Sequence, residues 1–362
     1  MAETKITMRI LIDIGHPAHV HLFKNFSWEM QKKGHRILFT ARYKEYEINL
    51  LRYYGFDYIS FGKKNSSILS KITGLFKYNS KLLFISLKFK PDIFISHGSI
   101  HASQVSFILR KPHISLEDSG NMEQVRLYKP FTKAILTPDI LPEDLGKKQI
   151  RYSAYHELFY LHPKYFRPNK NIYKGLNISE NEPYCIIRFV AWKATHDYGH
   201  KGLLLSEKIN LINMISKKLK VFISSESHLP EQFIQYKINI PPEKMHDALA
   251  FASLYIGEGA TMASESGILG TPAIYINTIR RSYCEDQERF DLVSNFSNGK
   301  GVIEKALEIL SIPNYKENLK NNVNELLNEK INPTPFFVWF VENYPESVKT
   351  MKENPDYQYR FK

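Results

Sequence analysis

The sequence has 362 residues, of which 43% are hydrophobic and 13% aromatic, so it is long enough for two domains and too apolar for a disordered chain. Its two cysteines, Cys185 and Cys284, are too few and too far apart for a disulfide framework or a local CxxC metal site. The net charge of +12 favours anionic partners, but the basic residues are spread along the chain and form no tract, so no nucleic acid partner is expected.

No segment of the sequence is expected to span a membrane. The first apolar run is interrupted at Asp13, which makes it too short for the core of a signal peptide. The run FFVWFV at 336–341 is expected to be either a buried helix face or a patch that touches a membrane surface. We therefore expect a cytoplasmic protein that can also lie peripherally at the inner face of the cell membrane.

Strand and helix patterns alternate through the first half of the chain. Short apolar runs bounded by turn residues predict buried strands, and apolar residues three to four positions apart predict helices. Strands are expected at 8–14, 36–40, 58–61, 93–96, 111–116 and 134–136. Helices are expected at 20–33, 45–54, 66–88 and in a segment that ends at residue 109. This alternation predicts a parallel sheet with right-handed crossovers, in which ligands sit beyond the carboxyl ends of the strands.

A second alternating unit follows a polar, Asn-rich stretch at 168–182. Its strands are expected at 184–189, 220–224, 254–256 and 273–276, and its helices at 206–219, 244–252 and 261–269. The predicted fold class is α/β, with two Rossmann-like doubly wound domains that face a cleft. The expected domains are 1–168 and 169–345, followed by a C-terminal tail at 346–362.

The segment GEGATMASESGILGT at 257–271 combines a glycine turn with the start of a helix. Gly257 and Gly259 allow close approach of a ligand, and backbone N–H groups at a helix start attract phosphate. Thr261 is a good N-cap residue and could also bind a phosphate oxygen. Glu265 lies one turn further along, where an acid either stabilises the helix dipole or accepts hydrogen bonds from ribose hydroxyls. An ordinary capped helix stays open as the alternative, since the segment matches neither GxGxxG nor a P-loop.

The extended segment GEGATMASESGILGTPAIYI resembles the donor-binding segment of GT-B-fold proteins, which include the peptidoglycan N-acetylglucosaminyltransferase and the UDP-N-acetylglucosamine 2-epimerases. This resemblance implies that Gly259, Ala260 and Thr261 meet a diphosphate and that Glu265 binds the uridine ribose. MRILIDIGHPAHVHLF at the start, LTPDILPEDLGKKQIRYSAYHELFYLHPKYFRP, and Arg188 after the strand YCII resemble a prokaryotic GT-B-like family of unknown function.

Several loops of the first domain carry residues suited to proton transfer. The stretch Gly15–His19 contains His16 and His19, either of which could act as a base on a sugar hydroxyl or serve only in capping. His97 follows one strand as a candidate substrate contact, and Glu117 and Asp118 follow the next. In the epimerases an acid in a comparable place takes part in proton chemistry, but this sequence lacks their His-x-Glu-Ala-Gly-Leu-Arg form. The paired acids could therefore also be turn caps.

The second domain offers further donor contacts. Arg188 could neutralise a departing diphosphate, and Lys193 lies in a long loop at 190–202 that could hold a base and phosphates or act as a lid. By resemblance, Ser225 would lie near the nucleobase, and Glu285, Asp286 and Gln287 near the donor sugar. No DxD-type motif is present, so catalysis without a metal ion or cofactor is expected.

The leading hypothesis is a glycosyltransferase that moves a sugar from a nucleotide-diphosphate donor, a UDP-sugar, to a surface-polysaccharide or lipid-linked glycan acceptor. The basic surface and aromatic stretches such as 75–84 would suit an acceptor presented at a membrane, so a peripheral membrane contact is also expected. The alternatives are a UDP-N-acetylglucosamine 2-epimerase and a non-catalytic nucleotide-sugar or polyanion binder.

Overall fold

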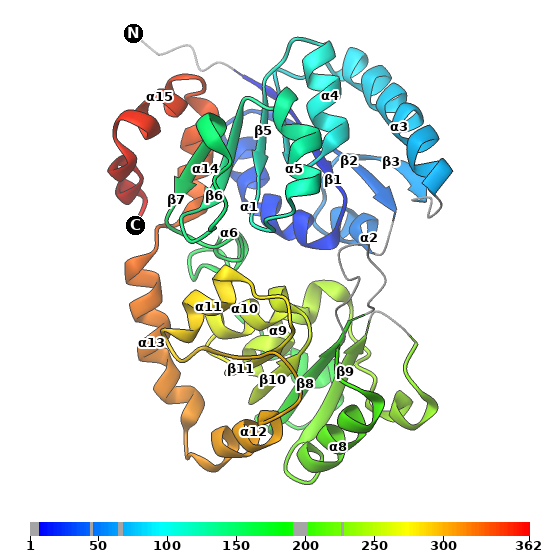
Figure 1. The fold of residues 1–362 in the computed structure, drawn as a ribbon, viewed down its shortest axis with the longest axis vertical. Helices are drawn as coiled ribbons and strands as arrows, with labels where there is room; N and C mark the ends of the chain where they lie inside the picture. The colour runs from blue at the N-terminus through cyan, green and yellow to red at the C-terminus, as the bar shows by residue number, and fades with distance from the viewer. Residues whose placement is uncertain (1–6, 44–45, 64–67, 191–201, 226–227) are drawn as a thin grey trace. The chain divides into compact units, whose positions relative to one another are not determined.

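The computed structural model describes residues 7–43, 46–63, 68–190, 202–225 and 228–362 (Figure 1). The chain divides into two compact units. Unit 1 contains residues 1–160 and 331–362, and unit 2 contains residues 161–330.

Unit 1 is built on a seven-stranded parallel sheet with the order β3-β2-β1-β4-β5-β6-β7. Its strands are β1 (Arg9–Ile14), β2 (Arg36–Tyr43), β3 (Tyr58–Lys63), β4 (Ile93–His97), β5 (His113–Leu116), β6 (Ala134–Pro138) and β7 (Gln149–Tyr152). The strands at the centre of the sheet are apolar and buried along their length, because helices cover both faces of a parallel sheet. The short strand β7, in which half-buried and fully buried residues alternate, was not among the predicted strands.

Helices form a layer on each face of this sheet. The helices of the first part of unit 1 are α1 (Pro17–Lys32), α2 (Glu47–Tyr53), α3 (Ile68–Phe89), α4 (Ile100–Ile108), α5 (Met122–Tyr128) and α6 (Leu158–Leu161, whose last residue falls in unit 2). Right-handed crossovers place α1 and α2 on one face and α3, α4 and α5 on the other. Contacts agree with this, since α3 packs on α4 and α4 on α5, whereas α1 packs on α2 (Figure 1).

The C-terminal helices α14 (Pro333–Glu342) and α15 (Glu346–Glu353) belong to unit 1. Phe337 is fully buried and its ring centroid lies 4.7 Å from that of Phe26 on α1, while the Thr334 hydroxyl donates to the backbone oxygen of Phe159 over 2.9 Å. The expected second domain at 169–345 with a tail at 346–362 is therefore corrected, because residues from 331 onward complete the core of the first unit. The run 336–341 is a largely buried helix face, which was one of its two interpretations.

Unit 2 has a five-stranded parallel sheet with the order β12-β11-β10-β8-β9. Its strands are β8 (Tyr184–Phe189), β9 (Lys220–Ser225), β10 (Leu254–Gly257), β11 (Ala273–Ile276) and β12 (Val293–Phe296). Its helices are α7 (Ile172–Gly175), α8 (Leu205–Ile215), α9 (Met245–Phe251), α10 (Ala260–Ile268), α11 (Ser282–Glu288), α12 (Val302–Ser311) and α13 (Tyr315–Glu329). The core gathers Ile187, Ile223, Ile256 and Ile274 from neighbouring strands. The predicted α/β class with two Rossmann-like sheets is confirmed.

Among the helices that the structure describes, none combines the length and apolar character that a membrane-spanning helix needs.

The place of α14 in the unit 1 core can be tested by replacing Phe337 with alanine. Truncating a fully buried phenylalanine typically costs about 3–5 kcal/mol, and we expect that loss in the free energy of unfolding of unit 1. Phe76, which is 70% exposed, provides the matched control, and its change to alanine should cost no more than about 0.5 kcal/mol. Denaturant unfolding combined with amide hydrogen exchange in β1 measures both. Equal small losses for the two variants would contradict the assignment.

Candidate functional site

The order of the strands marks one edge of the unit 1 sheet as a candidate site. From β1 the chain runs to β2 on one side, and β4 is followed by β5 on the other, so the connections diverge between β1 and β4. Ligands of doubly wound sheets bind at such a switch point, beyond the carboxyl ends of the strands. His16 and His19 follow β1, His97 ends β4, and Asp118 follows β5. The structure therefore brings candidate residues from three separate loops to one edge.

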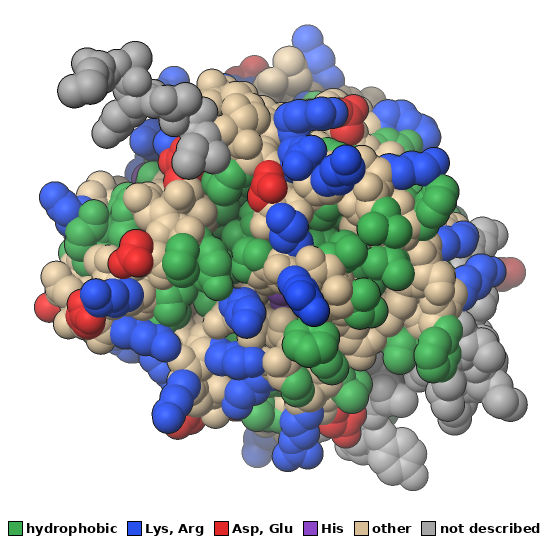
Figure 2. All heavy atoms as spheres, turned by 90° about the horizontal axis from the view of Figure 1, so that it is seen from above, with side chains coloured by type: hydrophobic (Ala, Val, Ile, Leu, Met, Phe, Trp, Pro, Cys, Tyr) green, Lys and Arg blue, Asp and Glu red, His purple; other side chains and the backbone are tan. Residues whose placement is uncertain are grey.

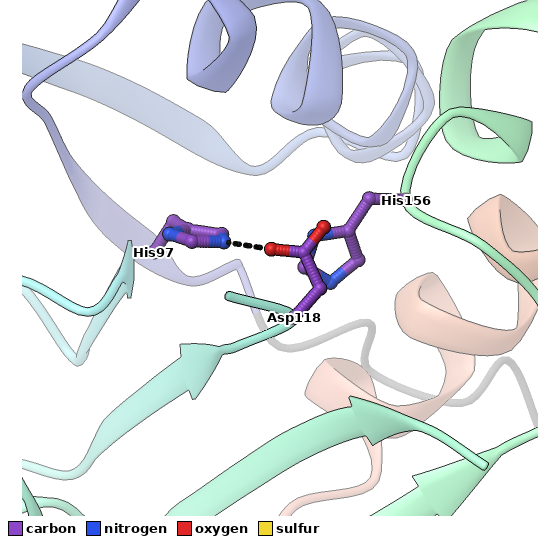
Figure 3. Close-up of side chains that lie close together, drawn as sticks. All are labelled: His97, Asp118 and His156. Carbon is purple, nitrogen blue, oxygen red and sulfur yellow. Dashed lines mark hydrogen bonds and ion pairs between the residues drawn. The ribbon is translucent and has the colours of Figure 1, made fainter. Parts of the chain in front are cut away.

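Asp118 accepts hydrogen bonds from two histidines at this edge. Its Oδ1 atom lies 3.0 Å from Nε2 of His97, and its Oδ2 atom lies 2.9 Å from Nδ1 of His156 (Figure 3). An ionised carboxylate can only accept hydrogen bonds, so both of these imidazole nitrogens carry the proton. Nδ1 of His97 is then the nitrogen left to accept a proton, and the His97 side chain keeps 15% of its surface exposed.

The charges of this cluster reinforce one another. Burial opposes a positive charge on His97, but the hydrogen bond and negative charge of Asp118, with Glu117, outweigh it and raise the pKa of His97. Burial also opposes ionisation of Asp118, yet the charge and hydrogen bond of His156, followed by those of His97, hold the pKa of Asp118 well below its usual range. Asp118 is therefore ionised at neutral pH, which suits it to orient His97 and to stabilise its protonated form.

His19 and His16 lie beside this cluster in different settings. The His19 ring stacks on the ring of His97 with centroids 4.6 Å apart, and its Nδ1 atom accepts the backbone N–H of Gly15 over 3.3 Å. Burial, followed by the charges of His97 and His16, holds the pKa of His19 well below its usual value, so His19 is neutral. His16 is the N-cap of α1 and accepts the N–H of Ala18. The structure shows His16 capping α1, which was its alternative interpretation. Catalytic roles for His16 and His19 stay predictions.

Glu117 is held in contacts inside unit 1. One carboxylate oxygen accepts the N–H and the hydroxyl of Ser119, and the other accepts the Tyr128 hydroxyl over 3.0 Å. Burial and then the charge of Glu117 raise the pKa of Tyr128, which keeps that phenol protonated. Gly98 packs against this group with φ at +61°, a conformation that favours glycine. The turn-cap interpretation of Glu117 is thus observed, and a catalytic role for it stays a prediction.

The structure adds two residues to this edge that sequence reasoning missed. His156 follows the unpredicted strand β7, and although its segment carried part of the family resemblance, no spacing linked it to Asp118. Asp13, the acid at the end of β1, is buried and accepts hydrogen bonds from Thr40 over 2.7 Å and from Ser99 over 2.5 Å. Its position at a strand end was the available signal. It ties β1 to β2 and to the start of α4.

The three side chains His97, Asp118 and His156 also offer donor atoms within 4.8 Å of one another, a set that could hold a metal ion. The sequence analysis expected no metal site. It did not consider these three residues together, because His156 was not among its candidate residues. To bind a metal, the nitrogens that now donate to Asp118 would have to release their protons. The observed hydrogen bonds therefore describe the proton-bearing form of the cluster.

Unit 2 has a corresponding switch point between β8 and β10. Arg188 on β8 lies opposite Gly257 on β10, and its guanidinium donates to the Ser224 hydroxyl on β9 over 2.7 Å. A Cβ atom on Gly257 would lie 2.5 Å from the Tyr255 hydroxyl oxygen and 2.8 Å from Cβ of Arg188, so only glycine fits. The structure thus brings Arg188 and the glycine turn together, and binding of a diphosphate by them stays a prediction.

Helix α10 begins directly after this turn. Its N-cap is Gly259, which has no side chain to cap the helix, so the expected N-cap at Thr261 is corrected to a position inside the first turn. The first backbone N–H groups, from Ala260 and Thr261, are consequently not bound by a capping side chain. Such groups are suited to an anionic ligand.

Glu265 lies on α10 beside a histidine that sequence reasoning missed. Its Oε1 atom is 3.0 Å from Nε2 of His246 on α9, and both side chains are buried. His246 was expected within a helix at 244–252, but nothing in the sequence linked it to Glu265. The pairing holds the carboxylate in place, and binding of ribose by Glu265 stays a prediction.

Glu258, inside the glycine turn, is a fourth residue that sequence reasoning missed. It is buried and accepts the backbone N–H groups of Val190 over 3.0 Å and of Leu203 over 2.7 Å, and Nζ of Lys208 lies 3.5 Å away. This one carboxylate therefore fixes two backbone positions that flank the segment 191–201.

The remaining predicted contacts have varied settings. Lys193 lies outside the described residues, and Ser225 is half-buried at the end of β9. On α11, Glu285 is half-exposed, 3.7 Å from Arg280, whereas Asp286 is paired with Lys330 over 2.9 Å. Gln287 is fully buried and donates to Ser264 over 2.6 Å. Roles of these residues at a donor sugar stay predictions, and for Asp286 and Gln287 the observed contacts are internal to unit 2.

Comparison with known families gives a match to the model of a protein family of unknown function, DUF354, over residues 8–316. The chain belongs to this family. It is also 26% identical over 281 residues to an uncharacterized protein of Methanocaldococcus jannaschii, a match that covers 74% of this chain and 82% of that protein.

Solved structures similar to this DUF354 protein are GT-B nucleotide-sugar enzymes. The UDP-N-acetylglucosamine 2-epimerase of Neisseria meningitidis, bound to UDP-N-acetylglucosamine, has a TM-score of 0.65 at 15% identity. The match covers 92% of this chain and 99% of the epimerase chain. MnaA of S. aureus bound to UDP has a TM-score of 0.67 at 11% identity, covering 95% and 98%. The glycosyltransferase SsfS6 of Streptomyces sp. SF2575 has a TM-score of 0.58 at 13% identity, covering 93% and 100%. These likenesses confirm the predicted GT-B fold.

The pairing of His97 with Asp118 can be tested by replacing Asp118 with asparagine. This removes the partner that raises the pKa of His97 and leaves the burial that lowers it, so the pKa of His97 should fall. Titration of the histidine side chains by NMR measures the change. His162 in unit 2, whose pKa is lowered by burial and by Lys164, should keep its value in the variant. An unchanged pKa for His97 would show that the pair does not form in solution.

Proposed function

We propose that this DUF354 protein is a glycosyltransferase that moves a sugar from a UDP-sugar to a hydroxyl of a surface-polysaccharide or lipid-linked acceptor, without a metal ion. The observation that carries the proposal is the His97–Asp118 pair at the switch point of one GT-B unit. A histidine oriented by a hydrogen-bonded carboxylate is the arrangement that removes a proton from a hydroxyl group as it attacks.

In the proposed reaction, Nδ1 of His97 accepts the proton of the acceptor hydroxyl. The hydroxyl oxygen forms the new bond to the anomeric carbon, and the bond from that carbon to the diphosphate oxygen breaks, so the electron pair leaves with the nucleotide. Asp118 stabilises the imidazolium that forms, and His156 keeps Asp118 ionised and oriented. His156 acts through Asp118 and is therefore a positioning residue.

Unit 2 is assigned the nucleotide. The backbone N–H groups at the start of α10 and the guanidinium of Arg188 would bind the diphosphate and stabilise its charge as it leaves. Glu265, held by His246, would accept the ribose hydroxyls. The similar structures with bound UDP or UDP-N-acetylglucosamine support a uridine nucleotide as the donor group.

Nucleotide binding is tested first, by isothermal titration of UDP into the protein and into its Glu265→Gln variant. Loss of a charged hydrogen-bond acceptor typically costs about 1.5–3 kcal/mol, so the dissociation constant should rise roughly tenfold to a hundredfold. Glutamine keeps the size of the side chain. Glu325→Gln, at an exposed position of α13, serves as the control and should bind like the wild type. If no uridine, guanosine, thymidine or cytidine diphosphate binds, the nucleotide assignment is wrong. Equal binding by the Glu265 variant would remove only the ribose role.

Transfer itself is tested by incubating a UDP-sugar with and without candidate glycan acceptors. We expect acceptor-dependent release of UDP, with kcat reduced roughly 10²–10⁴-fold in His97→Gln. The rate should rise with pH through the raised pKa of His97, because the base must be unprotonated. In Asp118→Asn this rise should move to lower pH while the maximal rate falls. His162→Gln should leave the rate unchanged.

Two other results would overturn the proposed reaction. Interconversion of the UDP-sugar without any acceptor would identify an epimerase, and salt-dependent binding of polyanions without turnover would identify a binding protein. The metal-free scheme also expects full activity after dialysis against a chelator. Activity that is lost there and restored by zinc would assign the cluster of His97, Asp118 and His156 to a metal ion.

A further inference from the structure

Helix α3 has two different apolar faces. Gly74, Tyr78, Leu82 and Ser86 recur every four residues and are buried toward the sheet and α4. On the rest of the helix, Phe76, Phe84 and Leu87 are exposed to 70%, 59% and 57%. Packing of α3 inside unit 1 requires only the buried face. The exposed side chains Phe76, Phe84 and Leu87 form a second apolar area, which unit 1 does not cover.

The same helix layer exposes further apolar side chains. Phe107 and Ile108 at the end of α4 and Leu127 on α5 are each more than half exposed. Because α4 packs against both α3 and α5, these side chains belong to one continuous layer. We call this the α3–α5 surface. It consists of Phe76, Phe84, Leu87, Phe107, Ile108 and Leu127, with the exposed basic residues Lys77, Lys81, Lys88, Lys90, Arg110, Lys111 and Arg126.

The charge of the α3–α5 surface is predominantly basic, although Glu123 on α5 is exposed and Lys111 lies 3.9 Å from Asp92. Helices α3 and α4 contain no aspartate or glutamate. Lys77, Lys81 and Lys88 form no ion pair with any residue that the structure describes, and Nζ of Lys88 lies 4.3 Å from the centroid of the Phe84 ring. Figure 2 shows hydrophobic side chains lying among Lys and Arg side chains toward the right of the view, the side on which α3 and α4 lie in Figure 1.

We propose that the α3–α5 surface docks this protein on an anionic lipid bilayer. Phenylalanine and leucine on an amphipathic helix enter the boundary between headgroups and acyl chains, and flanking lysines extend to the phosphates. Each basic residue near an anionic leaflet adds attraction that falls with salt. Three of the six apolar side chains, Leu87, Ile108 and Leu127, offer no ring for stacking on nucleobases, whereas all six can enter an acyl-chain boundary. The excess of basic residues matches a negatively charged layer. The inference rests on this surface alone and not on the proposed reaction.

The experiment is co-sedimentation of the full chain with vesicles of phosphatidylcholine, with and without phosphatidylglycerol. We expect binding only to the anionic vesicles and release at high salt. Phe84→Ser with Leu87→Ser should weaken partitioning roughly tenfold or more, because two apolar anchors are removed. Lys77→Glu with Lys81→Glu should weaken it to a similar degree.

Matched controls lie in unit 2. Ile234→Ser removes an apolar side chain that is 56% exposed, and Lys217→Glu with Lys218→Glu reverses two exposed charges, so both should bind vesicles like the wild type. Thermal unfolding checks that all variants fold. UDP binding should be unchanged in every variant, which separates failure of this inference from failure of the proposed function. Absence of vesicle binding, or equal binding by the α3–α5 variants, overturns the inference. A dimer that dissociates in those variants without any vesicle binding would assign the surface to a second copy of the chain.

Discussion

A carboxylate that is largely withdrawn from water needs hydrogen-bond donors, and Asp118, whose side chain is 17% exposed, finds them in the N–H groups of two imidazoles. This constraint fixes the protonated nitrogen of each ring, the orientation of His97 and the sign of the charge at the edge of the unit 1 sheet. It also explains why His156, far from Asp118 in sequence, lies where it does. The stacked His19 ring next to His97 must then stay neutral, since a further positive charge beside the same cluster would be repelled.

The two units have similar folds, but their switch points carry chemically different groups. In unit 1 the switch point holds His97, Asp118 and His156, side chains whose chemistry allows them to exchange protons. In unit 2 it holds Arg188, a glycine turn and the start of α10, which offer N–H donors to an anion. Crowding at Gly257 and the hydrogen bonds of the buried Glu258 restrict that turn and so hold its backbone donors in place. In the proposed reaction, proton transfer and anion binding would thus have separate structural supports.

Much of the fold follows from local sequence, because parallel strands buried on both faces are short continuous apolar runs. The central strands were predicted for that reason, whereas β7 and β12 were missed because polar residues interrupt them. Strand ends likewise pointed to His97, Asp118, Arg188 and Gly257. Partners supplied by distant segments carried no such signal. His156, His246 and the return of α14 to unit 1 depend on tertiary contacts that no local pattern encodes.

The return of α14 has a consequence for synthesis of the protein. Unit 2 is encoded wholly between the two parts of unit 1, so all of its residues leave the ribosome before Phe337 does. Until then the apolar sites on α1 that receive Phe337, around Phe26, lack their cover. Unit 2 can fold as soon as it emerges, while the N-terminal unit, although made first, reaches its final packing last. The order of maturation along this chain is therefore the reverse of the order in which its two units begin.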